Sequence, residues 1–137
     1  MGVTGKAPIF TITNENLTLN FYTSFAMKNT QNKALFDKAI KIAQKGEDLT
    51  DAIPVLMQLR EASKEANDPL VTKVLRLASQ HIENNGSFDL AQYFEEEPLP
   101  DDMSNLEYFL QLVADSDNKF NREELAQFRD ILTQLAQ

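Results

Sequence analysis

From residue 30 onward, apolar residues recur every three or four positions, in runs separated by glycine, proline and asparagine. This spacing places them on one face of an α-helix. Helices joined by short loops must cover such faces by packing against one another. The sequence therefore predicts an all-α fold, a small bundle of about five to six helices. The length of 137 residues, with 42% hydrophobic residues, suits a single domain over 1–137.

Capping and stop signals mark the first two predicted helices. Thr30 can cap a helix by accepting a hydrogen bond from its first turn, and Gly46 marks where this helix stops. Thr50 or Asp51 then opens the second helix, which we expect to continue to Asn67.

Asp68 followed by Pro69 predicts the start of a third helix, because aspartate is a favoured N-cap and proline suits the first helical position. Gly86 is expected to end this helix, and Ser87 can cap a further short one. Residues 30–96 are thus predicted to be a succession of helices.

Two similar signals mark the last two predicted helices. Ser104 is followed three residues later by Glu107, which is the spacing of a capping box. Asn121 and Glu124 repeat this spacing. Residues 104–137 are therefore predicted to form a helix–turn–helix.

The segment 1–29 is predicted to be a β-hairpin or an irregular stretch, and one alternative stays open. Apolar residues alternate with polar ones on both sides of an asparagine-containing turn, as in a hairpin. Over residues 9–25 a helix is the alternative, because three apolar residues are spaced by four: Leu17, Phe21 and Phe25.

Charge is distributed unevenly along the chain. The net charge is −8, yet residues 1–86 hold ten basic and nine acidic residues, whereas residues 87–137 hold three basic and twelve acidic ones. An acidic half repels the phosphates of nucleic acids, so we expect no nucleic-acid partner. Such a surface either keeps the protein in solution or docks a basic protein partner.

Residues 97–103 are predicted to be an exposed linker, because two prolines within an acidic run cannot continue a helix. We expect this part of the chain to bind a protein partner, through Glu95, Glu96, Glu97, Asp101 and Asp102. The neighbouring aromatic residues fall on helical stripes, which favours the core for most of them: Tyr93, Phe94, Tyr108 and Phe109. The predicted function is a non-catalytic helical interaction or assembly domain that acts through its acidic C-terminal half.

The residue types that most catalytic and cofactor sites need are scarce. There is no cysteine, which excludes disulfides, thiolate zinc sites and iron–sulfur clusters. The one histidine, His81, lies on a predicted helix, and no glycine elbow presents a nucleophile. No apolar run approaches the roughly 20 residues that span a bilayer, and no signal peptide is recognisable. We therefore expect a protein without enzymatic activity and without a cofactor other than the calcium described next. We also expect it not to associate with a membrane and to be located in the cytoplasm.

One turn, between the last two predicted helices, is rich in oxygen ligands. Calcium binds several carboxylate and amide oxygens on a tight loop, and Asn118 can adopt the positive φ that such a loop needs. Weak calcium binding would use Asp115, Asp117, Asn121, Glu123 and Glu124. The structural alternative is that Asp and Asn tighten the turn while Asn121 and Glu124 cap the next helix.

Residues 114–120 read Ala-Asp-Ser-Asp-Asn-Lys-Phe and are followed by acidic residues and an apolar stripe. Over residues 113–131 the chain resembles the acidic helix–turn–helix of tellurite-resistance TerB-like domains. The motif of that family reads Ala-x-x-Asp-Gly-x-Phe, so Asn118 stands at its glycine. The resemblance implies an all-α, mainly non-enzymatic domain linked to stress responses, with acidic, calcium-associated sites. On this alternative the chain is a divalent-metal-responsive module.

A second resemblance lies near the N-terminus. Thr11-Ile12 and the alternation from Leu17 to Phe21 are similar to the N-terminal hairpin of tail assembly chaperones of long-tailed phages, which also contain acidic helices. This similarity implies a role in assembly. A further alternative is an acidic mimic of nucleic acid, which needs its carboxylates spread along one elongated face.

Overall fold

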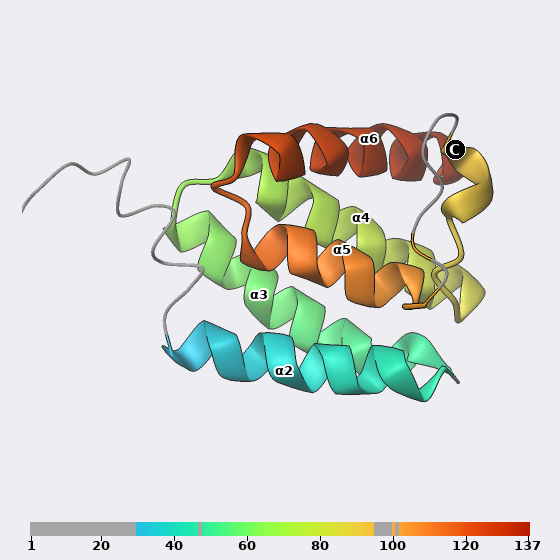
Figure 1. The fold of residues 1–137 in the computed structure, drawn as a ribbon, viewed down its shortest axis with the longest axis horizontal. Coiled ribbons are helices and arrows are strands. Elements are labelled where there is room, and N and C mark those ends of the chain that lie inside the picture. Colours follow the sequence, from blue (N-terminus) through green and yellow to red (C-terminus); the bar gives the residue numbers. More distant parts are fainter. Residues whose placement is uncertain (1–29, 47, 95–99, 101) are drawn as a thin grey trace, which may run out of the picture.

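Five α-helices and two short 3-10 helices make up the computed structural model, which describes residues 30–46, 48–94, 100 and 102–137. These residues contain five α-helices and no strand, which confirms the predicted all-α class and the predicted number of helices. The hairpin or helix predicted for residues 9–25 lies outside the described residues. The elements are α2 (Thr30–Lys45), η1 (Leu49–Ala52), α3 (Ile53–Glu65), α4 (Pro69–Asn85), η2 (Ala91–Tyr93), α5 (Asn105–Ala114) and α6 (Lys119–Leu135) (Figure 1).

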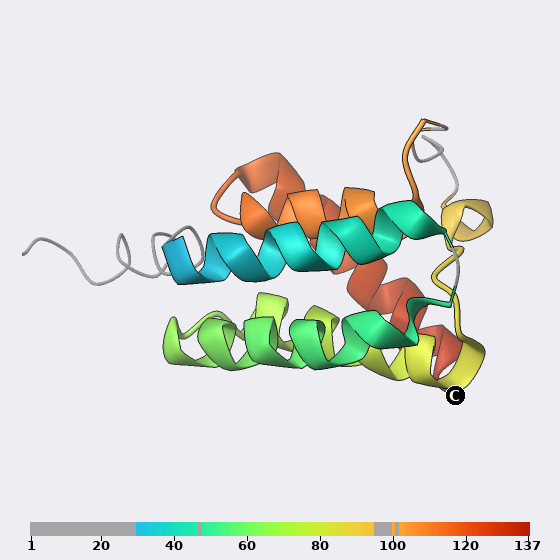
Figure 2. The same cartoon turned by 90° about the horizontal axis from the view of Figure 1, so that it is seen from below.

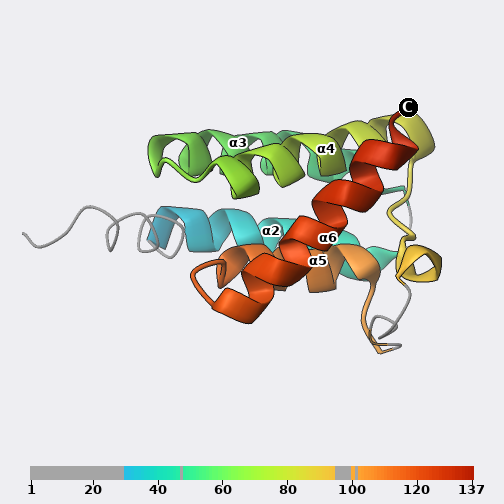
Figure 3. The same ribbon diagram turned by 90° about the horizontal axis from the view of Figure 1, so that it is seen from above.

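The helices pack in two pairs that α6 crosses. Helices α3 and α4 run antiparallel, and α2 packs against both α3 and α5. Figure 2 shows α2 and α5 on one side of the bundle and α3 and α4 on the other. Figure 3 shows α6 running obliquely across them, and its contacts are with α4 and α5. The α3–α4 turn, the α5–α6 turn and the start of α2 therefore lie at one end of the bundle (Figure 1).

An aromatic cluster lies at the centre of the core. The Phe128 ring on α6 is fully buried, with its centroid 5.2 Å from that of Phe109 on α5 and 6.2 Å from that of Phe88. Phe94, after η2, adds a fourth ring, 4.9 Å from Phe128. Several of these rings meet edge to face or tilted, which is the favoured geometry for aromatic pairs. The cluster thus joins α5, α6 and the segment after α4.

Several predicted helix ends are confirmed. The Asp68 side chain accepts a hydrogen bond from the backbone N–H of Val71 and caps α4, with Pro69 at the first helical position. Gly86 ends α4 with a φ of 72°, a conformation that glycine adopts without steric cost. The Ser104 hydroxyl accepts a hydrogen bond from the N–H of Glu107 and caps α5.

The second predicted helix begins differently from the prediction, whereas Asn67 marks its end as predicted. The Asp48 carboxylate accepts a hydrogen bond from the N–H of Thr50 and caps η1, so α3 itself begins only at Ile53. The predicted start at Thr50 or Asp51 is therefore wrong. Helix α3 ends at Glu65 with Ala66 as its cap, and Asn67 then stops the helix because its φ of 60° lies in the left-handed region.

The short helix predicted from Ser87 is also wrong. Only residues 91–93 form a single 3-10 turn, and no side chain caps it in the usual way. Instead, the side-chain oxygen of Asn105 accepts hydrogen bonds from the N–H groups of Leu90, at 2.6 Å, and Ala91, at 3.0 Å. A partner fourteen or fifteen residues away therefore satisfies these N–H groups, and no local capping signal is needed.

Candidate functional site

The α5–α6 turn carries most of the residues that the sequence singled out as metal ligands. Helix α6 starts at Lys119, and its cap is Asn118, whose side-chain oxygen accepts hydrogen bonds from the N–H groups of Phe120, at 2.8 Å, and Asn121, at 3.2 Å. The predicted cap formed by Asn121 and Glu124 is therefore wrong. The positive φ expected of Asn118 is wrong as well, because its φ is −72°.

The two displaced capping candidates make other contacts from within α6. The Asn121 side-chain N–H donates a hydrogen bond to the backbone oxygen of Asp115, 3.1 Å away. The Tyr108 hydroxyl on α5 lies 2.8 and 2.7 Å from the two carboxylate oxygens of Glu124 and donates its single O–H as a hydrogen bond to this carboxylate. Asn121 thus closes the turn, and Glu124 joins α5 to α6.

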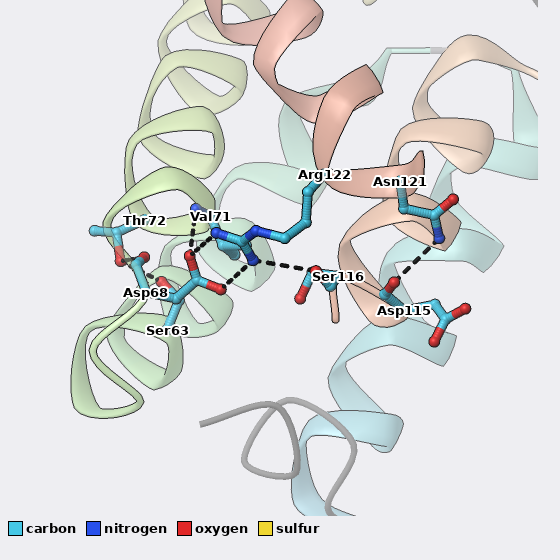
Figure 4. Close-up of polar contacts among 8 residues, drawn as sticks. All are labelled: Ser63, Asp68, Val71, Thr72, Asp115, Ser116, Asn121 and Arg122. Atoms are coloured by element: carbon cyan, nitrogen blue, oxygen red, sulfur yellow. Dashed lines mark hydrogen bonds and ion pairs between the residues drawn. The ribbon is translucent and has the colours of Figure 1, made fainter. Parts of the chain in front are cut away.

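Arg122 ties the α5–α6 turn to the α3–α4 turn (Figure 4). Its guanidinium donates to both carboxylate oxygens of Asp68, at 2.9 and 3.0 Å, and to the backbone oxygen of Ser116, at 3.1 Å. The Asp68 side chain is only 10% exposed and that of Arg122 is 39% exposed. The hydrogen bonds to Asp68 raise the pKa of Arg122 above its ordinary value, so this paired guanidinium stays charged. These hydrogen bonds therefore hold the α5–α6 turn in place against the start of α4.

The five predicted calcium ligands are not gathered at one point. Asp115, Asp117 and Glu123 are exposed, while Asn121 and Glu124 make the contacts described above. Within the part of the chain that the structure describes, no group of three or more acidic or histidine side chains is placed to hold a metal ion. Calcium binding at this turn stays a prediction.

The predicted partner-binding residues are described only in part. Asp102 is exposed, whereas Glu95, Glu96, Glu97 and Asp101 lie outside the described residues. Of the aromatic residues named beside them, Phe109 is buried, Phe94 and Tyr108 are half-buried, and Tyr93 is 45% exposed. The expectation that most of these aromatics belong to the core agrees with their burial.

Sequence analysis missed the most exposed apolar side chain. Phe120 is 72% exposed, compared with 45% for Tyr93 and 37% for Met57, the other exposed large hydrophobics among the described residues. It lies in the first turn of α6, and this helix begins at the end of the bundle that also holds the α3–α4 turn (Figure 1). At about 100° per residue, Phe120 lies about 80° from Phe128 and about 140° from Leu125 around the helix. Its spacing therefore places it off the buried face of α6, which was the signal available in the sequence.

His81 is half-buried on α4, and its ring meets that of Phe88 edge to face at 6.0 Å. Burial lowers the pKa of His81 below its ordinary value of 6.5, and the nearby charge of Asp89 opposes this shift. The site thus favours the neutral imidazole.

The lowered pKa of His81 predicts a pH dependence of stability. The unfolded chain takes up a proton at His81 more readily than the folded chain, so stability falls as the pH drops below about 6.5 and through the folded pKa. Urea unfolding of wild type and His81→Gln between about pH 7 and 5 measures this, and the wild-type stability should fall more steeply. Parallel curves for the two proteins would contradict the prediction.

Comparison with known proteins leaves both resemblances as predictions. No family model matches the chain, and neither a curated protein nor a solved structure matches it. No helix among the described residues is long and apolar enough to cross a membrane.

Proposed function

We propose that the chain is a non-catalytic helical interaction module that binds a basic protein partner through its acidic C-terminal half. The observation that carries this proposal is the exposure of the carboxylates in that half. The exposed acidic residues described there are Asp89, Asp102, Asp115, Asp117, Glu123 and Asp130. Of the three basic residues in 87–137, Arg122 pairs with Asp68 of the other half, and Arg129 pairs with Asp130, so the Arg129–Asp130 pair adds no net charge to this surface.

A surface of this kind favours a basic partner for two reasons. Its potential attracts positive charge and speeds encounter, and like-charged partners are repelled. The shifted pKa values support a role other than catalysis. A capping hydrogen bond from Thr50 lowers the pKa of Asp48, burial lowers that of His81, and Asp68 raises that of Arg122. Each shift thus has a local structural cause, and the three groups lie on different elements.

Charge reversal at two places tests the proposal, with the same change of net charge in both variants. One variant carries Asp102→Lys, Glu123→Lys and Asp130→Lys, all exposed and all in the acidic half. A matched control carries the same number of reversals at exposed acids of the other half: Asp51→Lys, Glu61→Lys and Glu65→Lys. Proteins retained from cell extract by wild type and by each variant are identified by mass spectrometry, and a retained protein is then purified for calorimetry.

The expected result is a basic protein retained by wild type and by the control, but not by the acidic-half variant. Its dissociation constant should rise with salt, because exposed charges are screened. Equal retention by the two variants, or binding that is insensitive to salt, would contradict a site in the acidic half.

A further inference from the structure

We propose that Phe120 is the apolar anchor of this interaction site, and that the partner offers an apolar pocket with a basic rim. This inference rests on the proposed function and names the contact point within it. Phe120 is 72% exposed in the first turn of α6, whereas Phe128 on the same helix is fully buried. A phenylalanine this exposed adds little to the core. Aromatic side chains of this kind carry much of the binding energy of protein interfaces.

The backbone beneath Phe120 is already fixed in the free protein. Its own N–H donates to the Asn118 side chain, the Asn121 side chain closes the turn onto Asp115, and Arg122 ties the turn to Asp68. A bound partner therefore has to order only the phenylalanine side chain, which has two rotatable bonds. Pre-organisation of this kind lowers the entropy cost of binding.

The charged residues near Phe120 indicate that the residues flanking the partner's apolar pocket are basic. Asp115, Asp117 and Glu123 are exposed within five residues of the ring along the chain. Lys119 is the adjacent cation, and Arg122 is paired with Asp68. An aromatic anchor with three exposed carboxylates and one exposed lysine nearby along the chain complements an apolar pocket flanked by lysine and arginine. The same carboxylates oppose insertion of Phe120 into an anionic membrane and its approach to nucleic acid.

Photo-crosslinking in the full chain tests this assignment. The photoreactive residue p-benzoylphenylalanine replaces Phe120 in one protein and Tyr93, the next most exposed aromatic, in the control. After irradiation in cells, the crosslinked residue is identified by mass spectrometry. We expect the residue at 120, and not the one at 93, to crosslink to an apolar residue flanked by lysine or arginine on a separate protein. With that protein purified, Phe120→Ser should weaken binding about tenfold, and Tyr93→Ser should leave it unchanged.

Several results would overturn the assignment. Crosslinks to residues 1–29 of the same chain, to a second copy or to lipid would show another occupant, and absence of any adduct at 120 would show none. Equal binding by wild type and Phe120→Ser would remove Phe120 as the anchor. If the acidic-half reversal still abolished binding in that case, the proposed function would stand without this inference. If Phe120→Ser and the acidic-half reversal both bound the partner as tightly as wild type, the anchor assignment and the proposed function would both be overturned.

Discussion

Replacing Phe128 with alanine is expected to lower the free energy of unfolding by about 3–5 kcal/mol. The ring is fully buried and lies within 4.9 to 6.2 Å, centroid to centroid, of Phe94, Phe109 and Phe88. Its removal leaves a cavity among side chains that come from separate segments and cannot easily collapse. A domain of this size is stable by only about 5–15 kcal/mol, so this one substitution removes a large share. Urea unfolding followed by circular dichroism measures the loss.

The same substitution at Phe120 is the matched control. Phe120 lies on the same helix and is 72% exposed, so its replacement by alanine should change stability by less than about 0.5 kcal/mol. Phe128→Leu, which keeps most of the volume, provides a smaller step if the alanine variant is largely unfolded. Equal losses at positions 120 and 128 would show that the aromatic cluster does not hold the core together.

Replacing Asp68 with alanine is expected to lower the free energy of unfolding by about 2–4 kcal/mol. The substitution removes the cap of α4 and both hydrogen bonds from Arg122. It also leaves the Arg122 guanidinium, which is 39% exposed, with its contact to Ser116 alone among the hydrogen bonds described. Partial access of water to Arg122 keeps the loss below that of a fully buried ion pair.

Asn at position 68 separates the two roles of this carboxylate. Asp68→Asn keeps a side-chain oxygen that can cap α4 but loses the charge, so it should cost about half as much as alanine. A double-mutant cycle of Asp68→Ala with Arg122→Met should give a coupling of about 1–2 kcal/mol. Additive losses in urea unfolding would show that the ion pair contributes nothing beyond the cap.

Local signals predicted the helix ends that depend on neighbouring residues. Asp68 caps α4 and Ser104 caps α5 as expected, because each side-chain oxygen lies within three residues of the N–H from which it accepts. Only this half of the predicted capping box is confirmed, since the Glu107 side chain accepts a hydrogen bond from Gln44 on α2, at 3.1 Å. Gly86 ends α4 for the same kind of reason, since one backbone conformation decides the stop.

The wrong predictions concern residues whose hydrogen-bond partners are far away in the sequence, or for which two nearby residues could form the same cap. Asn105 satisfies the N–H groups of Leu90 and Ala91, and no spacing rule connects these positions. At the α5–α6 turn, Asn118 precedes Asn121 and is the residue that caps α6. The Glu124 side chain accepts a hydrogen bond from Tyr108 on α5 instead of contributing to a cap. Phe120 is a different case, because its spacing from Leu125 and Phe128 already places it off the buried face of α6.

The contact between Asp68 and Arg122 has a consequence for the kinetics of folding. Its partners are 54 residues apart, with Asp68 at the cap of α4 and Arg122 in the first turn of α6, so the contact needs these two helices to have come together. Forming a contact between residues so far apart requires closing a long loop, which costs entropy and disfavours the contact early in folding. We therefore expect it to form mainly after the rate-limiting barrier, so that Asp68→Ala speeds unfolding and barely changes the folding rate in stopped-flow measurements.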